Sequence, residues 1–346
     1  MNVGALLVVG FDGTSLPRDL EKSLREGNRA GIILFRRNVV DMDQVHALCH
    51  ATLAAATTDL PPIVSVDQEG GRVARLHSPC LKVPPARKVG ERGPSLVERV
   101  AEAQARELRA LGFNLNFAPV LDIHTNEANP IIGDRAYGTT AEDVALRAAA
   151  YIRGAHAGGL LTCGKHFPGH GDTSQDSHLV LPIQDNPAEV LRGREFVPFQ
   201  RAIAAGVDAF MSAHVVYPRL DPATPATLSK TIVTDILREE MNFEGVLFSD
   251  DLEMKALSED TGENAVLSIA AGCDLLLICA TEARQMAAEE ALRRECEKSA
   301  AFRARVEEAL MRATAMRRKV RPMPTLPSFP ELVSAHGALA AELAAL

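Results

Sequence analysis

The stretch Leu161–His178, LTCGKHFPGHGDTSQDSH, joins an apolar segment to a loop that is dense in ionisable side chains. The first residues predict a buried strand, and the glycines and proline that follow predict a sharply turning loop. Three histidines, one lysine and two acids lie between positions 165 and 178. A rigid strand that leads into such a loop is typical of a catalytic site, although a polar surface loop is the ordinary alternative.

Similar apolar segments recur along the whole chain, separated by helical patterns. The eight predicted strands are Leu6–Gly10, Gly31–Phe35, Ile63–Asp67, Leu115–Val120, Leu161–His166, Ala209–His214, Gly245–Asp250 and Cys273–Ile278. Most are continuously apolar, as expected for parallel strands that are buried on both faces. The alternation therefore predicts an α/β protein with a single-domain (β/α)8 TIM barrel, and a doubly wound open sheet is the alternative.

Two helix starts are marked by capping residues. Ser95 with Glu98 predicts a capping box for a helix that ends at Gly112, and Thr139 with Glu142 predicts a second helix start. We expect the barrel to occupy residues 1–320. Residues 321–346 are expected to form a Pro-rich segment followed by one C-terminal helix that packs on the barrel.

The composition narrows the functional classes. The 346-residue chain is 47% hydrophobic, has a net charge of −8 with dispersed Lys and Arg, and contains no Trp. Dispersed basic residues argue against nucleic acid and membrane surfaces as partners. The six cysteines show no CxxC spacing, the N-terminus has no basic region typical of a signal peptide, and no apolar run reaches roughly 18 residues. We expect a cytoplasmic protein, a monomer, whose partner is a small molecule.

Five polar residues fall at or just beyond the carboxyl ends of predicted strands, namely Asp67, Asp122, His166, His214 and Asp250. In a barrel these ends meet on one face, and that face holds the active site. A single such residue can be structural. Five on different strands favour a functional site.

Asp250 ends its strand, and a carboxylate in that position suits a nucleophile. The next residue, Asp251, suits a helix N-cap. Asp176 and His178 are separated by one residue and can project to the same side of an extended loop, where the acid could orient the imidazole for proton transfer. An Asp–His contact on the surface is the alternative. Glycines 169 and 171 make a mobile loop plausible.

Two further loops carry groups suited to sugar hydroxyls. DQEGGRVAR (67–75) contains acids and arginines around paired glycines, and NPIIGDR (129–135) ends in Arg135. Gly-Gly is also ordinary turn chemistry, and Arg135 could be a surface ion-pair partner. The spacing of a phosphate-binding P-loop is absent. We expect Arg135 and Lys165 to lie at the mouth of the cavity.

Six segments resemble one family in order along residues 1–320: VDQEGGRVARL, LNFAPVLDI, NPIIGDRAYG, GKHFPGHGDTSQDSH, MSAHVVYP and GVLFSDDLEM. Together they are similar to the bacterial β-N-acetylglucosaminidases (β-hexosaminidases of the NagZ type) of glycoside hydrolase family 3. The KHFPGHG…DSH combination is the most specific of them.

The resemblance implies a retaining exo-hydrolase that needs no metal or cofactor. It implies Asp250 as the nucleophile that forms a covalent glycosyl intermediate, and His178 as the acid/base in a dyad with Asp176. It also implies that the terminal N-acetylglucosamine (GlcNAc) is bound by Asp67, Arg75, Arg135, Lys165 and His166. The implied role is peptidoglycan recycling, by cleavage of GlcNAc from GlcNAc–1,6-anhydro-MurNAc and its peptides.

Three alternatives remain open at this point. A metal-dependent hydrolase on the same barrel would use His166, His170, His178, His214 and Asp250 as ligands, although no HxH or HExxH spacing is present. A non-catalytic muropeptide-binding protein is a second alternative. The third is another activity within the family, a β-glucosidase or an N-acetylglucosaminide phosphorylase.

Overall fold

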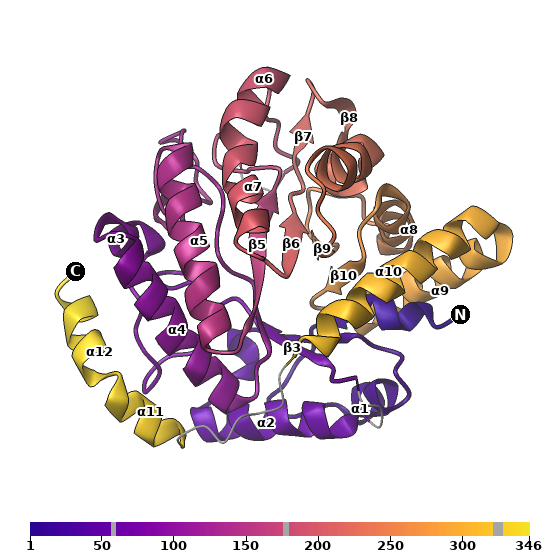
Figure 1. Cartoon of the computed structure of the whole chain (residues 1–346). Helices are drawn as coiled ribbons and strands as arrows, with labels where there is room; N and C mark the ends of the chain where they lie inside the picture. The colour runs from indigo at the N-terminus through magenta and orange to yellow at the C-terminus, as the bar shows by residue number, and fades with distance from the viewer. Residues whose placement is uncertain (57–59, 176–179, 321–327) are drawn as a thin grey trace.

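The computed structural model describes residues 1–56, 60–175, 180–320 and 328–346, and its centre is a closed barrel of eight parallel strands (Figure 1). The barrel strands are β1 (Leu7–Val9), β2 (Gly31–Leu34), β3 (Ile63–Val66), β4 (Leu115–Asn116), β5 (Leu161–Phe167), β6 (Ala209–Ser212), β9 (Val246–Asp251) and β10 (Leu275–Ile278). Hydrogen bonds join β1 to both β2 and β10, which closes the ring. This confirms the predicted barrel and the existence of all eight predicted strands, although β4 ends at Asn116 and β10 begins only at Leu275, and the open sheet is wrong.

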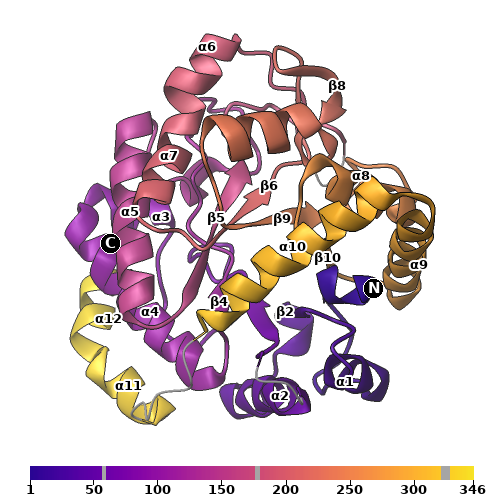
Figure 2. The ribbon, with the colours of Figure 1, turned by 45° about the vertical axis from the view of Figure 1, so that its right-hand side comes forward.

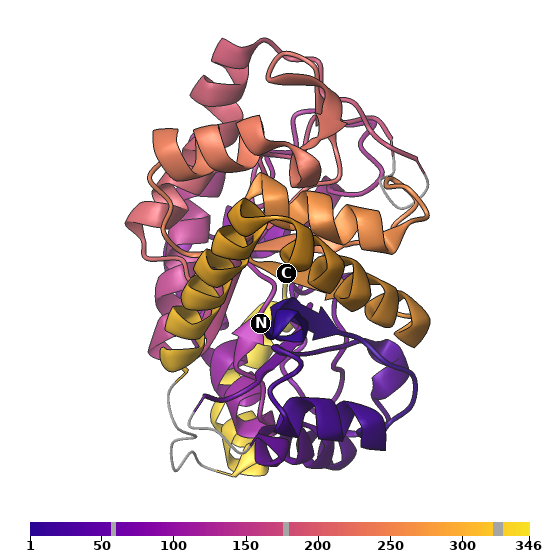
Figure 3. The same cartoon turned by 90° about the vertical axis from the view of Figure 1, so that its right-hand side faces the viewer.

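Helices surround the barrel on its outside. They are α1 (Arg18–Arg25), α2 (Met42–Ala55), α3 (Ala86–Glu91), α4 (Pro94–Leu111), α5 (Ala141–Ala157), α6 (Ala188–Val190), α7 (Phe196–Ala204), α8 (Thr261–Ala271), α9 (Glu282–Lys298), α10 (Ala300–Arg318), α11 (Phe329–Ala335) and α12 (Gly337–Ala344). Shorter helical segments are η1 (Val3–Leu6), η2 (Arg36–Asn38), η3 (Gly133–Arg135), η4 (Leu191–Glu195), η5 (Ala226–Leu228) and η6 (Thr231–Glu240). Figure 3 shows the N-terminal helices (indigo) at one end of the molecule and the segments after β5 (pink) at the other.

The interior of the barrel is filled by apolar side chains. Phe117 and Phe248 meet edge to face there with ring centroids 5.3 Å apart, and Val8 and Ile33 belong to the same buried cluster. A second and larger cluster lies between strands and helices. Because the interior is packed, a ligand can enter only at an end of the barrel. Within the described part of the chain, no helix is both long and apolar enough to cross a membrane.

The helix ends agree with the sequence in part. Gly112 follows α4 with φ of 101°, a left-handed conformation that glycine adopts without strain, as predicted. The capping box at Ser95 is wrong, because α4 begins at Pro94, which is suited to the first helical turn. The cap of α5 is Thr140, whose side chain accepts from the Asp143 backbone N–H, one residue later than predicted.

The N-cap prediction for Asp251 is also wrong. Asp251 is the last residue of β9, and the next helix, α8, starts ten residues later with Asp260 as its cap. The Asp260 side chain accepts from the backbone N–H of Glu263. Asp251 instead belongs to the face of the barrel described below.

Two features were not predicted. After β6 the chain forms a small antiparallel hairpin, β7 (Val216–Tyr217) with β8 (Asp221–Pro225), whose prolines conceal any strand pattern. The C-terminus forms two helices, α11 and α12, in place of one, and both lie along α3 and α4 (Figures 1 and 2). Residues 321–327 lie outside the described residues, so the domain boundary at position 320 stays a prediction.

Candidate active site

A cavity of about 380 Å³ opens at the carboxyl ends of the strands. Six of the eight predicted site residues line it: Asp67, Arg75, Arg135, Lys165, His166 and Asp250. They come from β5 and β9 and from the loops that follow β3 and β4. The other two, Asp176 and His178, lie outside the described residues. The structure thus brings together residues that are up to 183 positions apart in the sequence.

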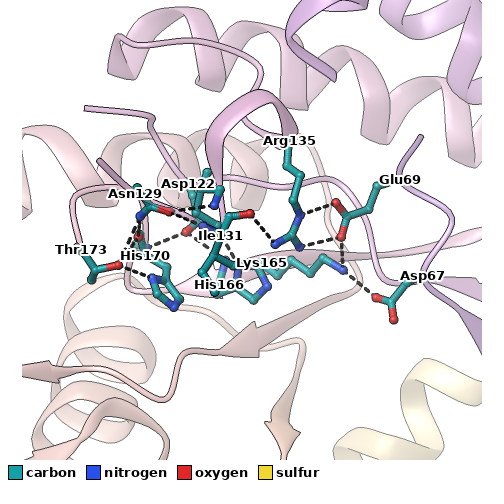
Figure 4. Close-up of polar contacts among 12 residues, drawn as sticks. Asp67, Glu69, Asp122, Asn129, Ile131, Arg135, Lys165, His166, His170 and Thr173 are labelled. Atoms are coloured by element: carbon teal, nitrogen blue, oxygen red, sulfur yellow. Dashed lines mark hydrogen bonds and ion pairs between the residues drawn. The ribbon is translucent and has the colours of Figure 1, made fainter. Parts of the chain in front are cut away.

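Lys165 is the most buried cation of the cavity. Its Nζ lies 2.7 Å from Asp67 Oδ1 and 2.6 Å from Glu69 Oε1, and its side chain is 2% exposed (Figure 4). Burial alone would lower the pKa of Lys165, but the two carboxylates outweigh it and raise the pKa above its ordinary value. Lys165 is therefore a charged group that holds two acids at the cavity wall.

Arg135 completes this cluster from the loop after β4. Its Nε and Nη2 donate to the two carboxylate oxygens of Glu69, each at 2.8 Å. Burial would raise the pKa of Glu69, but Arg135 and Lys165 outweigh it and hold this pKa well below its ordinary value. The expectation that Arg135 and Lys165 sit at the cavity mouth is therefore wrong. Both cations pair with the buried Glu69, so removing either one would leave part of its buried charge uncompensated.

Arg75 is the more accessible cation. Its Nη2 lies 3.2 Å from Asp67 Oδ2, its side chain is 26% exposed, and its guanidinium lies over the Phe35 ring at 5.6 Å. The loop is fixed by Gln68, whose Oε1 accepts from the backbone N–H groups of Arg75 and Leu76 at 2.8 and 3.0 Å. Arg75 can therefore donate to a ligand while Asp67 keeps it in place.

His166 is oriented by a buried carboxylate. Asp122 Oδ2 lies 2.6 Å from His166 Nδ1, and Asp122 Oδ1 accepts from the backbone N–H groups of His166 and His170 (Figure 4). Burial would raise the pKa of Asp122, but the two histidines and these bonds outweigh it and lower that pKa. Because an ionised carboxylate only accepts, Nδ1 of His166 carries the proton and donates. His166 Nε2 is then the ring atom left for a ligand.

His170 also lines the cavity and is held by its own loop. Its Nδ1 lies 2.8 Å from Thr173 Oγ1, and Asn129 Nδ2 donates to the His170 carbonyl at 2.9 Å. Burial lowers the pKa of His170 to about 4, despite the nearby Asp122. His170 is therefore a neutral imidazole at physiological pH, and Asn129 ties its loop to the loop that carries Arg135.

Asp250 lies at the end of β9 and faces the cavity. Its Oδ1 accepts from the backbone N–H of Asp251 at 2.8 Å. The Asp251 side chain accepts from the backbone N–H groups of Glu253 and Cys279 at 3.1 and 3.2 Å, which joins the ends of β9 and β10. Burial raises the pKa of Asp251 to about 7. The strand end that presents Asp250 is thus fixed on both sides.

His214 does not join the other histidines. Its Nδ1 lies 2.8 Å from Thr227 Oγ1 and its Nε2 lies 3.0 Å from the Asp251 carbonyl, so both ring nitrogens connect the chain after β6 to its neighbours. The prediction that His214 faces the site is therefore wrong. Among the residues that the structure describes, no three or more His, Cys, Asp or Glu side chains are arranged to hold a metal.

The loop that begins at Gly169 is anchored by Arg194 of η4. Arg194 Nη2 lies 2.7 Å from Asp172 Oδ2 and its Nε donates to Glu195 Oε1 at 2.6 Å. A Cβ at Gly169, where φ is 128°, would meet Glu195, and one at Gly171 would lie 1.8 Å from a backbone oxygen. These two glycines therefore allow close packing at the start of the loop, and the mobility of the loop stays a prediction.

Three groups of the site were not predicted to bind the sugar or to act in catalysis: Glu69, the shared anion, Asp122, the partner of His166, and His170, which lines the cavity. Asp122 was noted only for its place beyond a strand end, and His170 only as a ligand in the metal-dependent alternative. Glu69 carries no such signal, because it lies in a turn whose side-chain directions follow from the folded loop alone.

Comparison with known proteins agrees with this geometry. Residues 2–316 match the family model of the glycosyl hydrolase family 3 N-terminal domain. The chain is 41% identical to a β-hexosaminidase of Stenotrophomonas maltophilia over 80% of its own length and 84% of that protein, and 40% identical to one of Pseudomonas aeruginosa over 83% and 86%.

Solved structures give the same result. A family 3 β-N-acetylglucosaminidase from Paenibacillus sp. str. FPU-7 superposes with a TM-score of 0.89 at 39% identity, over 96% of this chain and 67% of that one. NagZ from Neisseria gonorrhoeae, in complex with N-trifluoroacetyl-D-glucosamine, superposes with a TM-score of 0.75 at 31% identity, over 88% and 97%. The chain therefore belongs to glycoside hydrolase family 3 and is a β-N-acetylhexosaminidase of the NagZ-like group.

Proposed function

We propose that this enzyme is a retaining exo-β-N-acetylglucosaminidase of the cytoplasm that releases GlcNAc from GlcNAc–1,6-anhydro-MurNAc and its peptides during peptidoglycan recycling. The observation that carries the proposal is the meeting of Asp250 with Asp67, Arg75, Lys165 and His166 around one cavity of sugar size. The names of the related β-hexosaminidases support the choice of sugar.

The binding groups suit a terminal sugar. Each pyranose hydroxyl both donates and accepts, and the cavity offers the Asp67 carboxylate as an acceptor, Arg75 and Lys165 as donors, and the Nε2 ring atom of His166. Charge-assisted bonds of this kind contribute about 1.5–3 kcal/mol each. A cavity of about 380 Å³ with a packed floor leaves space for one sugar residue, which favours removal of the chain end over internal cleavage.

In the proposed first step, an Asp250 carboxylate oxygen bonds to the anomeric carbon as the bond from that carbon to the leaving oxygen breaks. His178 gives its proton to that oxygen. Water then attacks the glycosyl–Asp250 ester, the same imidazole takes the water proton, and Asp250 leaves as a carboxylate. Two inversions give net retention.

The position of the acid/base pair is supported by the chain around it. Thr173 lies on the anchored loop beside the cavity, and the five residues from there to His178 span at most about 17 Å. Asp176 would accept from one ring nitrogen of His178 and leave the other to transfer the proton. A dyad replaces the second carboxylate that most glycosidases use.

The test is an assay with aryl β-N-acetylglucosaminide, aryl β-glucoside and purified GlcNAc–anhydro-MurNAc, each with and without phosphate and with and without a strong chelator. We expect hydrolysis of both N-acetylglucosaminides, NMR detection of β-GlcNAc as the first product, and no dependence on phosphate or chelator. Preference for the glucoside, a sugar-1-phosphate product, inversion, or loss of activity with the chelator would each contradict the proposal.

A further inference from the structure

A second and larger cavity, of about 990 Å³, lies behind the loop that carries the sugar-binding residues. Its walls are formed by residues 68–85, by Glu107 of α4 and by the C-terminal helices α11 and α12. Figures 1 and 2 show these two helices along the outer side of α3 and α4. The proposed mechanism uses none of the groups that line it.

One loop separates the two cavities. Asp67, Glu69, Val73 and Arg75 line the sugar cavity, whereas Gln68, Arg72, Ala74 and Leu76 line the second one. The loop turns at Gly70 and Gly71, whose φ angles are 114° and 54°, and its side chains on either side of this turn are shared between the two cavities. The wall between the cavities is therefore a single loop of chain, and a ligand on one side contacts the backbone that positions Asp67 and Arg75 on the other.

The interior of the second cavity is apolar, and its polar groups are already bonded. Leu76, Leu81 and Leu343 contribute to its walls. Glu107 accepts from the Leu81 backbone N–H at 2.8 Å and pairs with His336 Nδ1 at 2.9 Å. The Gln68 side chain is likewise used within its own loop. A peptide or sugar would bury polar groups here without partners, whereas an aliphatic chain would not.

The rim of the same cavity is basic. Arg36, His77 and Lys82 are exposed there, and no hydrogen bond or ion pair is recorded for their side chains within the described residues. Glu107 is the sole acid among the lining residues described, and it is buried in its pair with His336. On a chain with a net charge of −8, this cationic rim above an apolar interior is complementary to an amphipathic anion.

We propose that the second cavity is a ligand site for an aliphatic monocarboxylate, with the carboxylate at the Arg36–Lys82 rim and the chain inside, and that its occupancy strengthens sugar binding. The coupling follows from the shared wall, because a ligand that packs against Leu76 and Ala74 favours the backbone conformation that holds Asp67 and Arg75 in place. By reciprocity, the sugar strengthens carboxylate binding by the same factor.

The test uses decanoate as the probe and decanol as its uncharged match, with binding to the full chain measured by calorimetry. We expect one saturable decanoate site that saturating GlcNAc does not displace, and a KM for aryl N-acetylglucosaminide that falls about fivefold or more with decanoate. Arg36→Glu with Lys82→Glu should weaken decanoate binding about tenfold or more and leave decanol binding unchanged. Lys298→Glu, a charge reversal at an exposed position on α9, is the control. It should change neither decanoate binding nor decanol binding.

Val333→Trp, which fills the cavity from α11, should remove binding of both probes while kcat without decanoate stays the same. If Val333→Trp does not fold, the double variant Arg36→Glu with Lys82→Glu is sufficient to test the site. Absence of saturable binding, displacement by GlcNAc, or equal binding by the charge-reversed pair and the control would overturn the site. A KM that does not respond to bound decanoate would overturn the coupling, whatever the natural sugar substrate is.

Discussion

At the amino end of the barrel, polar side chains stand immediately before three strands: Asn114 before β4, Asp208 before β6 and Asp274 before β10. Each accepts from the backbone N–H of the second residue of the preceding barrel neighbour, namely Val64, Thr162 and Leu247, at 2.9–3.1 Å. The two acids also bind other side chains: Asp208 contacts His156 and Lys319, and Asp274 contacts three arginines.

At the carboxyl end, acids are held differently. Asp67, Glu69 and Asp122 bind side chains from β5 and from the loops that follow β3 and β4, and those side chains also line a cavity. Asp250 faces the same cavity from the end of β9. Buried acids thus tie strands together at one end of the barrel and line a cavity at the other. The two groups of acids both lie beside apolar strands. They differ in their partners, which are backbone N–H groups and structural side chains at the amino end and cavity-lining side chains at the carboxyl end.

The largest expected effect is a loss of activity without a loss of stability, caused by a change at the carboxyl end. Asp250→Ala should lower kcat by several orders of magnitude on every substrate while the melting temperature stays within a few degrees, since the change removes a nucleophile from a cavity wall. Kinetics and thermal unfolding of the same preparation check this. Near-normal turnover by the folded variant would place the nucleophile elsewhere.

The next effect concerns the loop above the carboxyl end. His178→Ala should lower hydrolysis of GlcNAc–anhydro-MurNAc about 10²–10⁴-fold, and far less that of nitrophenyl N-acetylglucosaminide, because a nitrophenolate leaves without a proton. Added azide should restore turnover of the nitrophenyl substrate, since azide attacks the intermediate without a base. Asp176→Ala should show a milder form of the same pattern. Equal losses on both substrates without azide rescue would mean that His178 only holds the sugar or the loop.

At the amino end the expected effect is on stability. Asp274→Asn leaves Arg238, Arg305 and Arg312 without their shared anion, which should lower the free energy of unfolding by about 3–5 kcal/mol. The kcat/KM of the folded variant should match wild type. Chemical denaturation and steady-state kinetics give both numbers.

The control for that change is Asp235→Asn, an exposed acid on η6, which should alter stability by less than about 0.5 kcal/mol. A lower kcat/KM in Asp274→Asn, measured where the variant is fully folded, would show that the two ends are not independent.

The smallest effect is the pH dependence of stability that comes from His170. The native pKa is about 4 and the ordinary value is 6.5, so between these pH values the unfolded chain holds a proton that the native chain does not. The unfolding free energy should therefore rise with pH across this window, by about 3 kcal/mol from this group. His170→Gln should flatten the curve relative to wild type, whereas the exposed control His77→Gln should not. Parallel curves for wild type and His170→Gln would contradict the buried neutral imidazole.

The sequence was sufficient for the barrel because each strand is a short apolar run on its own, and the strand-end rule then located Asp67, His166 and Asp250 on one face. The same rule failed for His214, since the hairpin after β6 was concealed by prolines and the short helix η5 that follows it supplies Thr227 as the partner of His214. Residue type and spacing alone do not show whether a neighbour or a cavity faces a side chain.

The inward position of Lys165 could not be predicted for a related reason. It depends on Glu69, which lies 96 residues earlier in a turn between two glycines and Asp67. The pairing follows from the closure of the barrel, which brings the loop after β3 beside the end of β5. Such long-range pairs have no local pattern in the sequence, and the same is true of Asp172 with Arg194.

The central claim is that the carboxyl end of the barrel works through a covalent bond to Asp250. Incubation with a 5-fluoro-N-acetylglucosaminyl fluoride, followed by peptide mass spectrometry, tests it directly. The 5-fluorine slows both formation and breakdown of the intermediate, and the good fluoride leaving group keeps formation faster than breakdown, so the intermediate accumulates. We expect one adduct of the fluorinated sugar on the peptide that contains residues 245–254, with fragment ions that place it on Asp250 and none on Asp251. An adduct on another carboxylate, or complete inactivation without any adduct, would contradict the account.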